Sequence, residues 1–150
     1  MTIKCFDKLP DEAVKIRTLV FVEEQGFKNE FDSIDEIATH IVMFDGDNPI
    51  AVGRFFPSEN EGKYIVGRVA VKKEYRGKNL GTEILKTCEV EIKKIGGTAV
   101  TVSAQVQAEN FYKKQGYVSV GETYFDEHCP HIKICLLYTS PSPRDRTRSR

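Results

Sequence analysis

The chain has 150 residues, of which 40% are hydrophobic and 29% are charged. This composition is ordinary for a globular protein, and the length suits one domain with a substantial core. No apolar run approaches the roughly 20 residues needed to cross a bilayer, and the opening residues Met1 to Lys4 lack a secretory signal pattern. We therefore expect a cytoplasmic protein with no membrane partner.

Charge is balanced over the whole chain but unevenly distributed. Lys plus Arg and Asp plus Glu each number 22, and residues 138–150 hold four arginines and one aspartate. That segment has a net charge of +3, so residues 1–137 carry −3, which gives no electrostatic reason to expect a nucleic-acid partner. Its Ser, Pro and Arg content predicts disorder. The stretch from Cys135 to Asp145 resembles a translated sequencing adapter, and we interpret the tail at 138–150 as an artefact rather than a basic arm.

The four cysteines form no Cys-x-x-Cys pair. This favours free thiols in a reducing compartment over a disulfide framework. We also expect no metal site.

Hydrophobic periodicity predicts the elements of the first half. A strand at 3–6 precedes a helix that begins at 10–12 and ends near Gly26. The buried face of that helix is expected to hold Val14, Arg17, Thr18, Phe21 and Val22. The acidic segment 27–37 is a short helix or a loop. Strands at 39–44 and 50–56 form a hairpin, and a third strand covers 64–71.

The second half continues with a long helix from 80, whose apolar positions fall at helical spacing: Leu80, Ile84, Leu85, Cys88, Ile92 and Ile95. A strand at 98–104, a helix at 108–114, a strand starting at 117–120, a loop at 126–131 and a strand at 132–137 follow. This order predicts an α/β (α+β) fold over residues 1–137. Its sheet is mixed and mostly antiparallel, with about seven strands and helices on both faces.

One stretch predicts an anion site. The strand residues Val69, Ala70 and Val71 lead into a basic turn and a helix, and the turn reads Arg76-Gly77-Lys78-Asn79-Leu80-Gly81. The first amides of a helix lack internal partners and carry partial positive charge, so the turn is interpreted as a pyrophosphate cradle. Its spacing fits neither a P-loop nor a dinucleotide fingerprint. The alternative is an ordinary connection with a solvated basic face.

The turn resembles the Arg/Gln-x-x-Gly-x-Gly/Ala sequence with which the GNAT acetyltransferases grip coenzyme A. A second stretch, Ala108-Glu109-Asn110-Phe111-Tyr112-Lys113-Lys114-Gln115-Gly116-Tyr117, resembles the GNAT segment Ala-x-x-Phe-Tyr-x-x-x-Gly-Phe/Tyr. The two motifs span 64–117, and the order of elements is similar to that of the family over 3–137. The stretches Phe21 to Gln25 and Pro130-His131 are similar to the ElaA-like branch.

The resemblance implies an N-acyltransferase fold with splayed central strands. It implies acetyl transfer from acetyl-CoA to a primary amine of a small molecule or peptide, by direct attack in a ternary complex. The amides of Val69 to Val71 would face the thioester carbonyl and the pantetheine arm. Residues 76–81 would bind the diphosphate, with Gln105 as a further cofactor contact. Tyr112 would protonate the leaving thiolate. Alternatively, Tyr112 and Phe111 form the apolar face of a short helix; Phe111 is expected in the core.

The sequence leaves the general base and the acceptor site open. The candidate bases are histidines and acids that could accept the proton of the amine: His40, His128, His131, Glu23, Glu24, Asp126 and Glu127. His131 is favoured among the histidines as a base, and it is also a candidate substrate contact. Arg54 and Arg68 lie in predicted strands, where they would either orient a substrate carboxylate or pair with the acidic segment 27–37. The acidic segment itself suggests a cationic amine or a solvated surface.

Three positions depart from the family pattern. Asn79 replaces a glycine, although asparagine tolerates left-handed backbone. Gln105 replaces an asparagine, and Gly67 stands where a glutamate base is frequent. These departures motivate an alternative function, a non-catalytic acyl-CoA sensor or scaffold. A third hypothesis is nucleic-acid binding through 138–150. A homodimer is compatible with the sequence.

Overall fold

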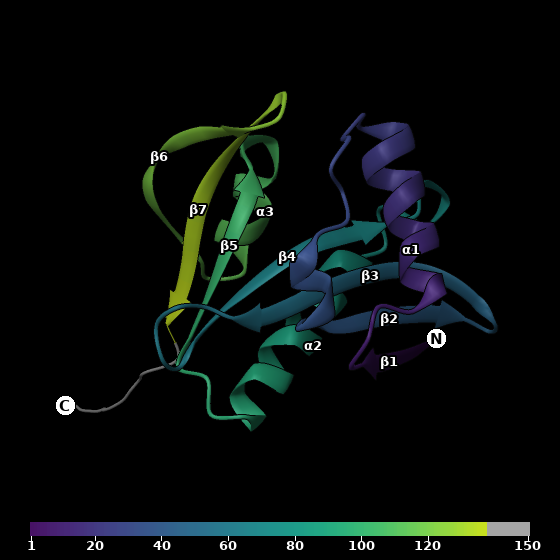
Figure 1. The fold of residues 1–150 in the computed structure, drawn as a ribbon, viewed down its shortest axis with the longest axis horizontal. Coiled ribbons are helices and arrows are strands. Elements are labelled where there is room, and N and C mark those ends of the chain that lie inside the picture. Colours follow the sequence, from purple (N-terminus) through teal and green to yellow (C-terminus); the bar gives the residue numbers. More distant parts are fainter. Residues whose placement is uncertain (138–150) are drawn as a thin grey trace. The chain divides into compact units, whose positions relative to one another are not determined.

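The structure, a computed structural model, describes residues 1–137 and contains seven strands in one sheet (Figure 1). The strand order is β1-β2-β3-β4-β5-β7-β6. The pairs β1–β2, β2–β3, β5–β7 and β6–β7 are antiparallel. The predicted seven-stranded, mostly antiparallel sheet is therefore confirmed. The strands are β1 (Thr2–Phe6), β2 (Thr39–Asp45), β3 (Asn48–Pro57), β4 (Lys63–Val71), β5 (Ala99–Gln105), β6 (Val118–Asp126) and β7 (Cys129–Leu137).

The chain forms two compact units, each built from two separate stretches. The first unit contains Met1–Phe56 and Val66–Glu91, and the second contains Pro57–Ile65 and the chain from Ile92 onward. β4 and α2 (Leu80–Lys94) contribute residues to both units. The predicted artefactual tail at 138–150 lies outside the described residues.

In the first unit, helical segments cover both faces of β3. Successive strand residues point to opposite faces. A Cβ at Gly53 would lie 2.6 Å from Ile84 Cγ2, so this face of β3 packs directly on α2. The next residue, Arg54, points to the other face and binds Asp35 of η2 (Ser33–Glu36) at 2.7 Å. The absence of a side chain at Gly53 is what allows α2 to approach this closely.

The first predicted helix is two elements. α1 (Asp11–Arg17) continues into η1 (Thr18–Glu24), a π-helix, and the Gln25 amide still donates to the Val20 carbonyl at 3.1 Å. The predicted buried face was wrong by one position. The segment is apolar on most sides, so periodicity does not select one face. The residues buried in the structure are Ala13, Ile16, Arg17, Val20 and Phe21.

The core of α2 follows the predicted spacing until its end. Leu80, Ile84, Leu85, Cys88 and Ile92 are all buried. Ile95, which was also predicted to be buried, lies beyond the helix and is 58% exposed. The Gly97 amide turns back to the Ile92 carbonyl at 2.9 Å, and Gly96 has a φ of 92°. The two glycines therefore end the helix one residue before the apolar pattern ends.

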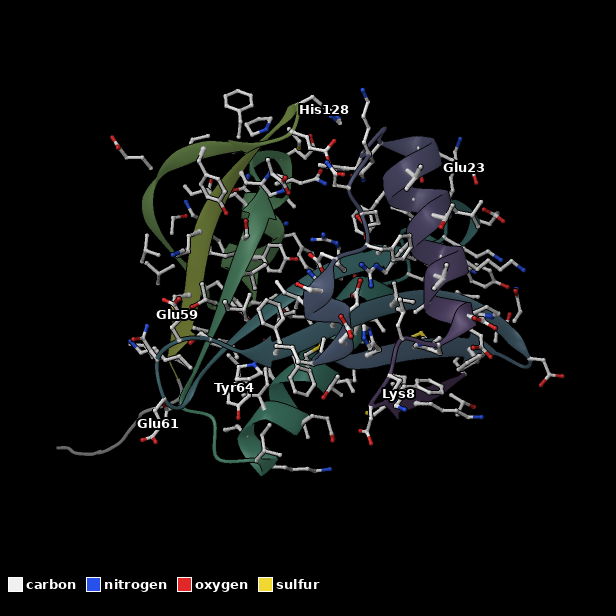
Figure 2. All side chains as sticks on the ribbon, viewed as in Figure 1. Lys8, Glu23, Glu59, Glu61, Tyr64 and His128 are labelled. Atoms are coloured by element: carbon white, nitrogen blue, oxygen red, sulfur yellow. The ribbon has the colours of Figure 1, made fainter. Side chains whose placement is uncertain are left out.

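The second unit contains β5, η4 (Val106–Ala108), α3 (Glu109–Lys114) and the β6–β7 hairpin. The predicted loop at 126–131 was wrong, because β6 and β7 meet in a two-residue turn of Glu127 and His128 (Figure 2). Almost all of β6 is exposed. The residues of 126–131 that lie in strands are Asp126 of β6 and Cys129, Pro130 and His131 of β7, and the mostly polar, proline-containing stretch they belong to was therefore interpreted as a loop.

No helix within residues 1–137 has both the length and the apolar character that a membrane crossing requires. All four cysteines are free thiols in this part of the chain, as expected.

Candidate functional site

The turn between β4 and α2 has a backbone suited to an anion. η3 (Lys73–Tyr75) leads to Arg76 in extended conformation, and Gly77 and Asn79 are left-handed, with φ of 83° and 62°. α2 begins at Leu80, so its first amides, which have no partner inside the helix, lie at the end of the turn. Added side-chain bulk at Gly77 would meet no atom within 4 Å. Asn79 thus takes the conformation that a glycine would supply, and the turn forms despite the substitution.

The Arg76 side chain is held by η1. Its two terminal nitrogens bind the two carboxylate oxygens of Glu24, each at 2.6 Å, and its Nε donates to the Val71 carbonyl at 2.9 Å. The hydrogen bond from Arg76 lowers the pKa of Glu24, so this carboxylate stays ionised. Both side chains remain partly exposed, at 41% for Arg76 and 36% for Glu24. A bidentate pair of this kind fixes the guanidinium beside the turn.

The remaining turn side chains are also supported. The Lys78 ammonium lies 5.4 Å from the centre of the Tyr75 ring, and the Tyr75 hydroxyl donates to Asp45 at 2.8 Å. At the start of the turn, the Lys72 amide donates to the Ile50 carbonyl of β3 at 2.9 Å. The basic turn is therefore tied to the β2–β3 hairpin on one side and to η1 on the other.

β4 is interrupted next to the predicted carbonyl-binding amides. Arg68 has a φ of 53°, whereas the residues of a regular strand have negative φ. Val69, Ala70 and Val71 follow directly, with Ala70 buried and the two valines partly exposed. A left-handed residue within a strand turns the peptide groups that follow it, as in a β-bulge.

An ion cluster, buried except at Asp32 and Arg68, lies over the opposite face of β3 from α2. We define it as Arg17, Arg54 and Arg68 with Glu30, Asp32 and Asp35. The four shortest ion pairs join Arg17 to Glu30 (2.8 Å) and Asp35 (2.7 Å), and Arg54 to Asp32 (2.8 Å) and Asp35 (2.7 Å). Arg68 binds Glu30 at 2.9 Å and Asp32 at 3.6 Å. Three cations thus balance three anions.

The cluster shifts the pKa values of Glu30 and Asp35 in opposite directions. Burial raises the pKa of Glu30, against the opposing influence of Arg68 and Arg17. Burial also opposes ionisation of Asp35, but hydrogen bonds from Arg17, the Asp32 amide and Arg54 outweigh it and lower its pKa to about 2. His40 is buried, its Nε2 lies 3.0 Å from the Asp35 carbonyl, and burial lowers its pKa.

The cluster shows which of the two alternatives predicted for Arg54 and Arg68 the structure contains. Arg54 and Arg68 pair with the acidic segment 27–37, which was one of the two predictions. A substrate carboxylate would have to displace Asp32 or Glu30 from them. By the same pairing, Glu30, Asp32 and Asp35 are already neutralised by arginines, which leaves Glu36 as the exposed acid of this segment outside the cluster.

In the second unit, Tyr112 of α3 is buried and surrounded by aromatic rings. Its ring centre lies 5.0 Å from that of Phe111 and 5.7 Å from that of Tyr117, both edge-on. Tyr112 is 7% exposed, whereas Phe111, which was expected in the core, is only partly buried. The short helix therefore turns the phenol inward and its neighbour outward.

His131 and Gln105 are register partners on β7 and β5. His131 is 7% exposed, its Nδ1 lies 3.0 Å from the Cys129 carbonyl, and its ring stacks on Tyr124 with centres 6.1 Å apart. Gln105 accepts a hydrogen bond from Gln107 at 2.8 Å. The second unit thus brings together two of its three predicted site residues, Gln105 and His131.

The other candidate bases differ in exposure. His128 lies at the tip of the β6–β7 turn, and Glu23 lies on the outward side of η1 (Figure 2). His40 and Glu24 are already engaged, with the Asp35 carbonyl and with Arg76. No group of three or more His, Cys, Asp or Glu side chains in residues 1–137 is arranged to hold a metal ion.

The GNAT acetyltransferase domain family matches residues 5–137. The chain belongs to the GNAT family. It is an enzyme of the acyl-CoA-dependent N-acyltransferase class, and relatives place it in the ElaA-like branch. An uncharacterised N-acetyltransferase, YjcF of Bacillus subtilis, is 34% identical over 126 residues, which is 82% of this chain and 89% of that protein.

Two solved GNAT-fold structures are similar to the chain. The acyl-CoA N-acyltransferase from Pseudomonas aeruginosa has a TM-score of 0.79 and 26% identity, covering 89% of this chain and 97% of that one. Escherichia coli ElaA has a TM-score of 0.76 and 27% identity, covering 89% of this chain and 99% of that one. The family predicted from the two motifs is therefore confirmed, and so is the branch predicted from Phe21 to Gln25 and Pro130-His131.

Sequence reasoning missed two features of this GNAT chain. Glu24 was considered only as a base, whereas it holds Arg76. Glu30 was not singled out at all, although it lies at the centre of the ion cluster. The sequence signal for Glu30 was the unusual placement of Arg17, Arg54 and Arg68 in apolar elements, because buried arginines require acids nearby.

Proposed function

We propose that the protein transfers the acetyl group of acetyl-CoA to a primary amine of a small molecule or peptide, by direct attack in a ternary complex. The supporting observation is the turn from Arg76 to Gly81. Two left-handed positions, Gly77 and Asn79, and a fifteen-residue helix that begins directly after Asn79 form an anion cradle of the kind that grips a diphosphate.

The chain's own residues have distinct tasks in this proposal. The thioester of acetyl-CoA supplies the activated acyl group. The amides of Val69 to Val71, next to the left-handed Arg68, donate hydrogen bonds to the carbonyl oxygen as negative charge develops on it. Tyr112 donates its phenolic proton to the leaving sulfur. An aminoglycoside 6'-N-acetyltransferase has a similar fold, and this motivates an amine panel of broad structure.

The test is release of free CoA from acetyl-CoA in the presence of that panel, by wild type and Tyr112→Phe. Loss of the phenolic proton is expected to lower kcat by roughly 100-fold, which is the usual contribution of general acid catalysis. Tyr117→Phe is the matched control, because Tyr117 is also buried and packs edge-on against Tyr112. It should retain most of the activity. Equal rates for Tyr112→Phe and wild type would remove Tyr112 from this role.

A non-catalytic sensor is the alternative function. It predicts that CoA raises the melting temperature while no amine in the panel is acetylated. The sensor hypothesis was motivated by the substitutions at Gly67 and Asn79. The conformation of Asn79 weakens the second reason, because the turn keeps the backbone that a glycine would give. The nucleic-acid hypothesis depends on 138–150, outside the described residues, and is tested by salt-sensitive binding that disappears when this segment is deleted.

A further inference from the structure

Arg68 has a backbone conformation that its residue type does not explain. Within residues 1–137, three non-glycine residues have positive φ: Arg68, Asn79 and Glu127. Asparagine tolerates this region, and Glu127 lies in a hairpin turn. Arg68 lies inside β4, where an arginine with a Cβ is disfavoured at this φ. Something outside the strand must therefore hold it there.

The side chain of Arg68 is held at several atoms by one residue. Its Nε lies 2.9 Å from Glu30 Oε2 and 3.3 Å from the Glu30 carbonyl oxygen, and its Nη2 donates to the same carbonyl at 3.0 Å. Glu30 is 4% exposed. Both the carboxylate and the backbone of Glu30 thus grip one guanidinium, which restricts its position more than a single surface ion pair would.

Glu30 is itself fixed by the first helix. Arg17, which is 1% exposed, donates from Nε to Glu30 Oε2 at 2.8 Å and from Nη2 to the Glu30 carbonyl at 3.0 Å. Arg17 also donates to Asp35 at 2.7 Å. A buried network in which each member has a defined partner is rigid. The grip on Arg68 therefore extends from α1 through Glu30 to β4.

We infer that Arg68 is a positioning residue: Glu30 clamps its guanidinium, the clamp keeps the backbone of β4 left-handed at this point, and the amides of Val69 to Val71 are thereby aimed. The inference rests on the proposed function, because those amides are the groups assigned to the thioester carbonyl. Small errors in the aim of such donors are costly, since a displacement of about 1 Å can lower a rate by roughly 100-fold.

Two substitutions of Arg68 separate backbone conformation from side-chain chemistry. Arg68→Ala removes the clamp and leaves a residue that resists positive φ. Arg68→Gly also removes the clamp, but glycine accepts positive φ without steric cost. We expect kcat of Arg68→Ala to fall by roughly 10- to 100-fold, with little change in KM for acetyl-CoA, and Arg68→Gly to recover most of it. Glu30→Gln should also lower kcat, but by less than Arg68→Ala, because the backbone carbonyl of residue 30 still accepts hydrogen bonds from Arg68.

Hydrogen exchange of the amides of Val69 to Val71 provides a readout that needs no turnover. Exchange should be faster than wild type in Arg68→Ala and return toward wild type in Arg68→Gly, with melting temperatures confirming that each variant folds. If Arg68→Gly is as slow as Arg68→Ala, the guanidinium acts directly and the clamp is overturned. If Arg68→Ala matches wild type in rate and exchange, β4 holds its own shape and the clamp is also overturned. A wild type that acetylates no amine would refute the proposed function, while the exchange data would still decide the clamp.

Discussion

The ion pair between Glu24 and Arg76 places a carboxylate beside the turn assigned to an anionic cofactor. Replacing Glu24 with glutamine removes that negative charge while keeping the side-chain shape. Two charges about 7 Å apart in water interact by roughly 0.6 kcal/mol, so Glu24→Gln is expected to bind CoA about two- to fourfold more tightly at low salt. Titration calorimetry at low and high salt measures this, because screening should abolish the gain at high salt.

Glu23→Gln is the control for that measurement. Glu23 is the adjacent acid on η1 and is exposed, so the substitution removes the same charge without opening the pair with Arg76. It should change CoA affinity less than Glu24→Gln does. Weaker binding by Glu24→Gln would instead mean that the pair with Glu24 is needed to orient Arg76.

At the scale of elements, the contact between β3 and α2 depends on the missing side chain of Gly53. A Cβ there would lie 2.6 Å from Ile84 Cγ2 and 3.7 Å from Cys88 Sγ, and both of those residues are fully buried. Gly53→Ala should therefore destabilise the protein by about 1–3 kcal/mol through overpacking. Gly67→Ala in β4 is the control, because its Cβ would meet nothing within 4 Å. Urea unfolding midpoints of the two variants give the comparison, and equal midpoints would contradict the overpacking.

The elements themselves were largely readable from the sequence where their apolar pattern is clear. β2 and β3 are nearly continuous buried runs and α2 has a helical repeat, and the predicted limits of all three were within two residues of the observed ones. The failures came where the pattern is ambiguous. The segment that forms α1 and η1 is apolar almost all round, so the predicted face was misplaced, and the i→i+5 bonds of the π-helix depart from the 3.6-residue period. Only the start of β6 was predicted, and the loop predicted at 126–131 is occupied by the end of β6 and the first residues of β7.

At the scale of the whole molecule, the ion cluster should make stability depend on pH. The pKa of Asp35 is lowered from 3.8 to about 2 in the folded protein. Its contribution is thus complete above the unfolded pKa and is lost as the pH falls through the folded pKa, on the order of 2 kcal/mol between about pH 4 and pH 2. The raised pKa of Glu30 acts with the opposite sign, since its contribution is lost as the pH rises through the folded value.

Chemical unfolding at a series of pH values measures this dependence. Asp35→Asn should lose the decline between pH 4 and pH 2, and at neutral pH it should be less stable than wild type by about 3–5 kcal/mol, because two buried arginines lose a partner. Glu36→Gln, at an exposed acid outside the cluster, should keep the wild-type profile. A decline of the same size in Asp35→Asn would assign the acid sensitivity to other groups.

The candidate site was predicted in part, and the division has a physical reason. The turn from Arg76 to Gly81 is local in sequence, so its glycines, its asparagine and the following helix were readable together. The clamp on Arg68 joins residues 38 positions apart. Such a contact depends on how the acidic segment folds over β3, which no local pattern encodes. The sequence signalled this contact only through the arginines in predicted strands. That signal left two partners open, a substrate carboxylate and the acidic segment 27–37.

The balance of three arginines against three acids also constrains how the protein can diverge. A relative that loses one of the four buried members, Arg17, Arg54, Glu30 or Asp35, would leave a charge without its partner, so the change should be tolerated only together with a compensating one. We expect the six positions to covary across relatives, with Arg68 and Glu30 replaced jointly or not at all.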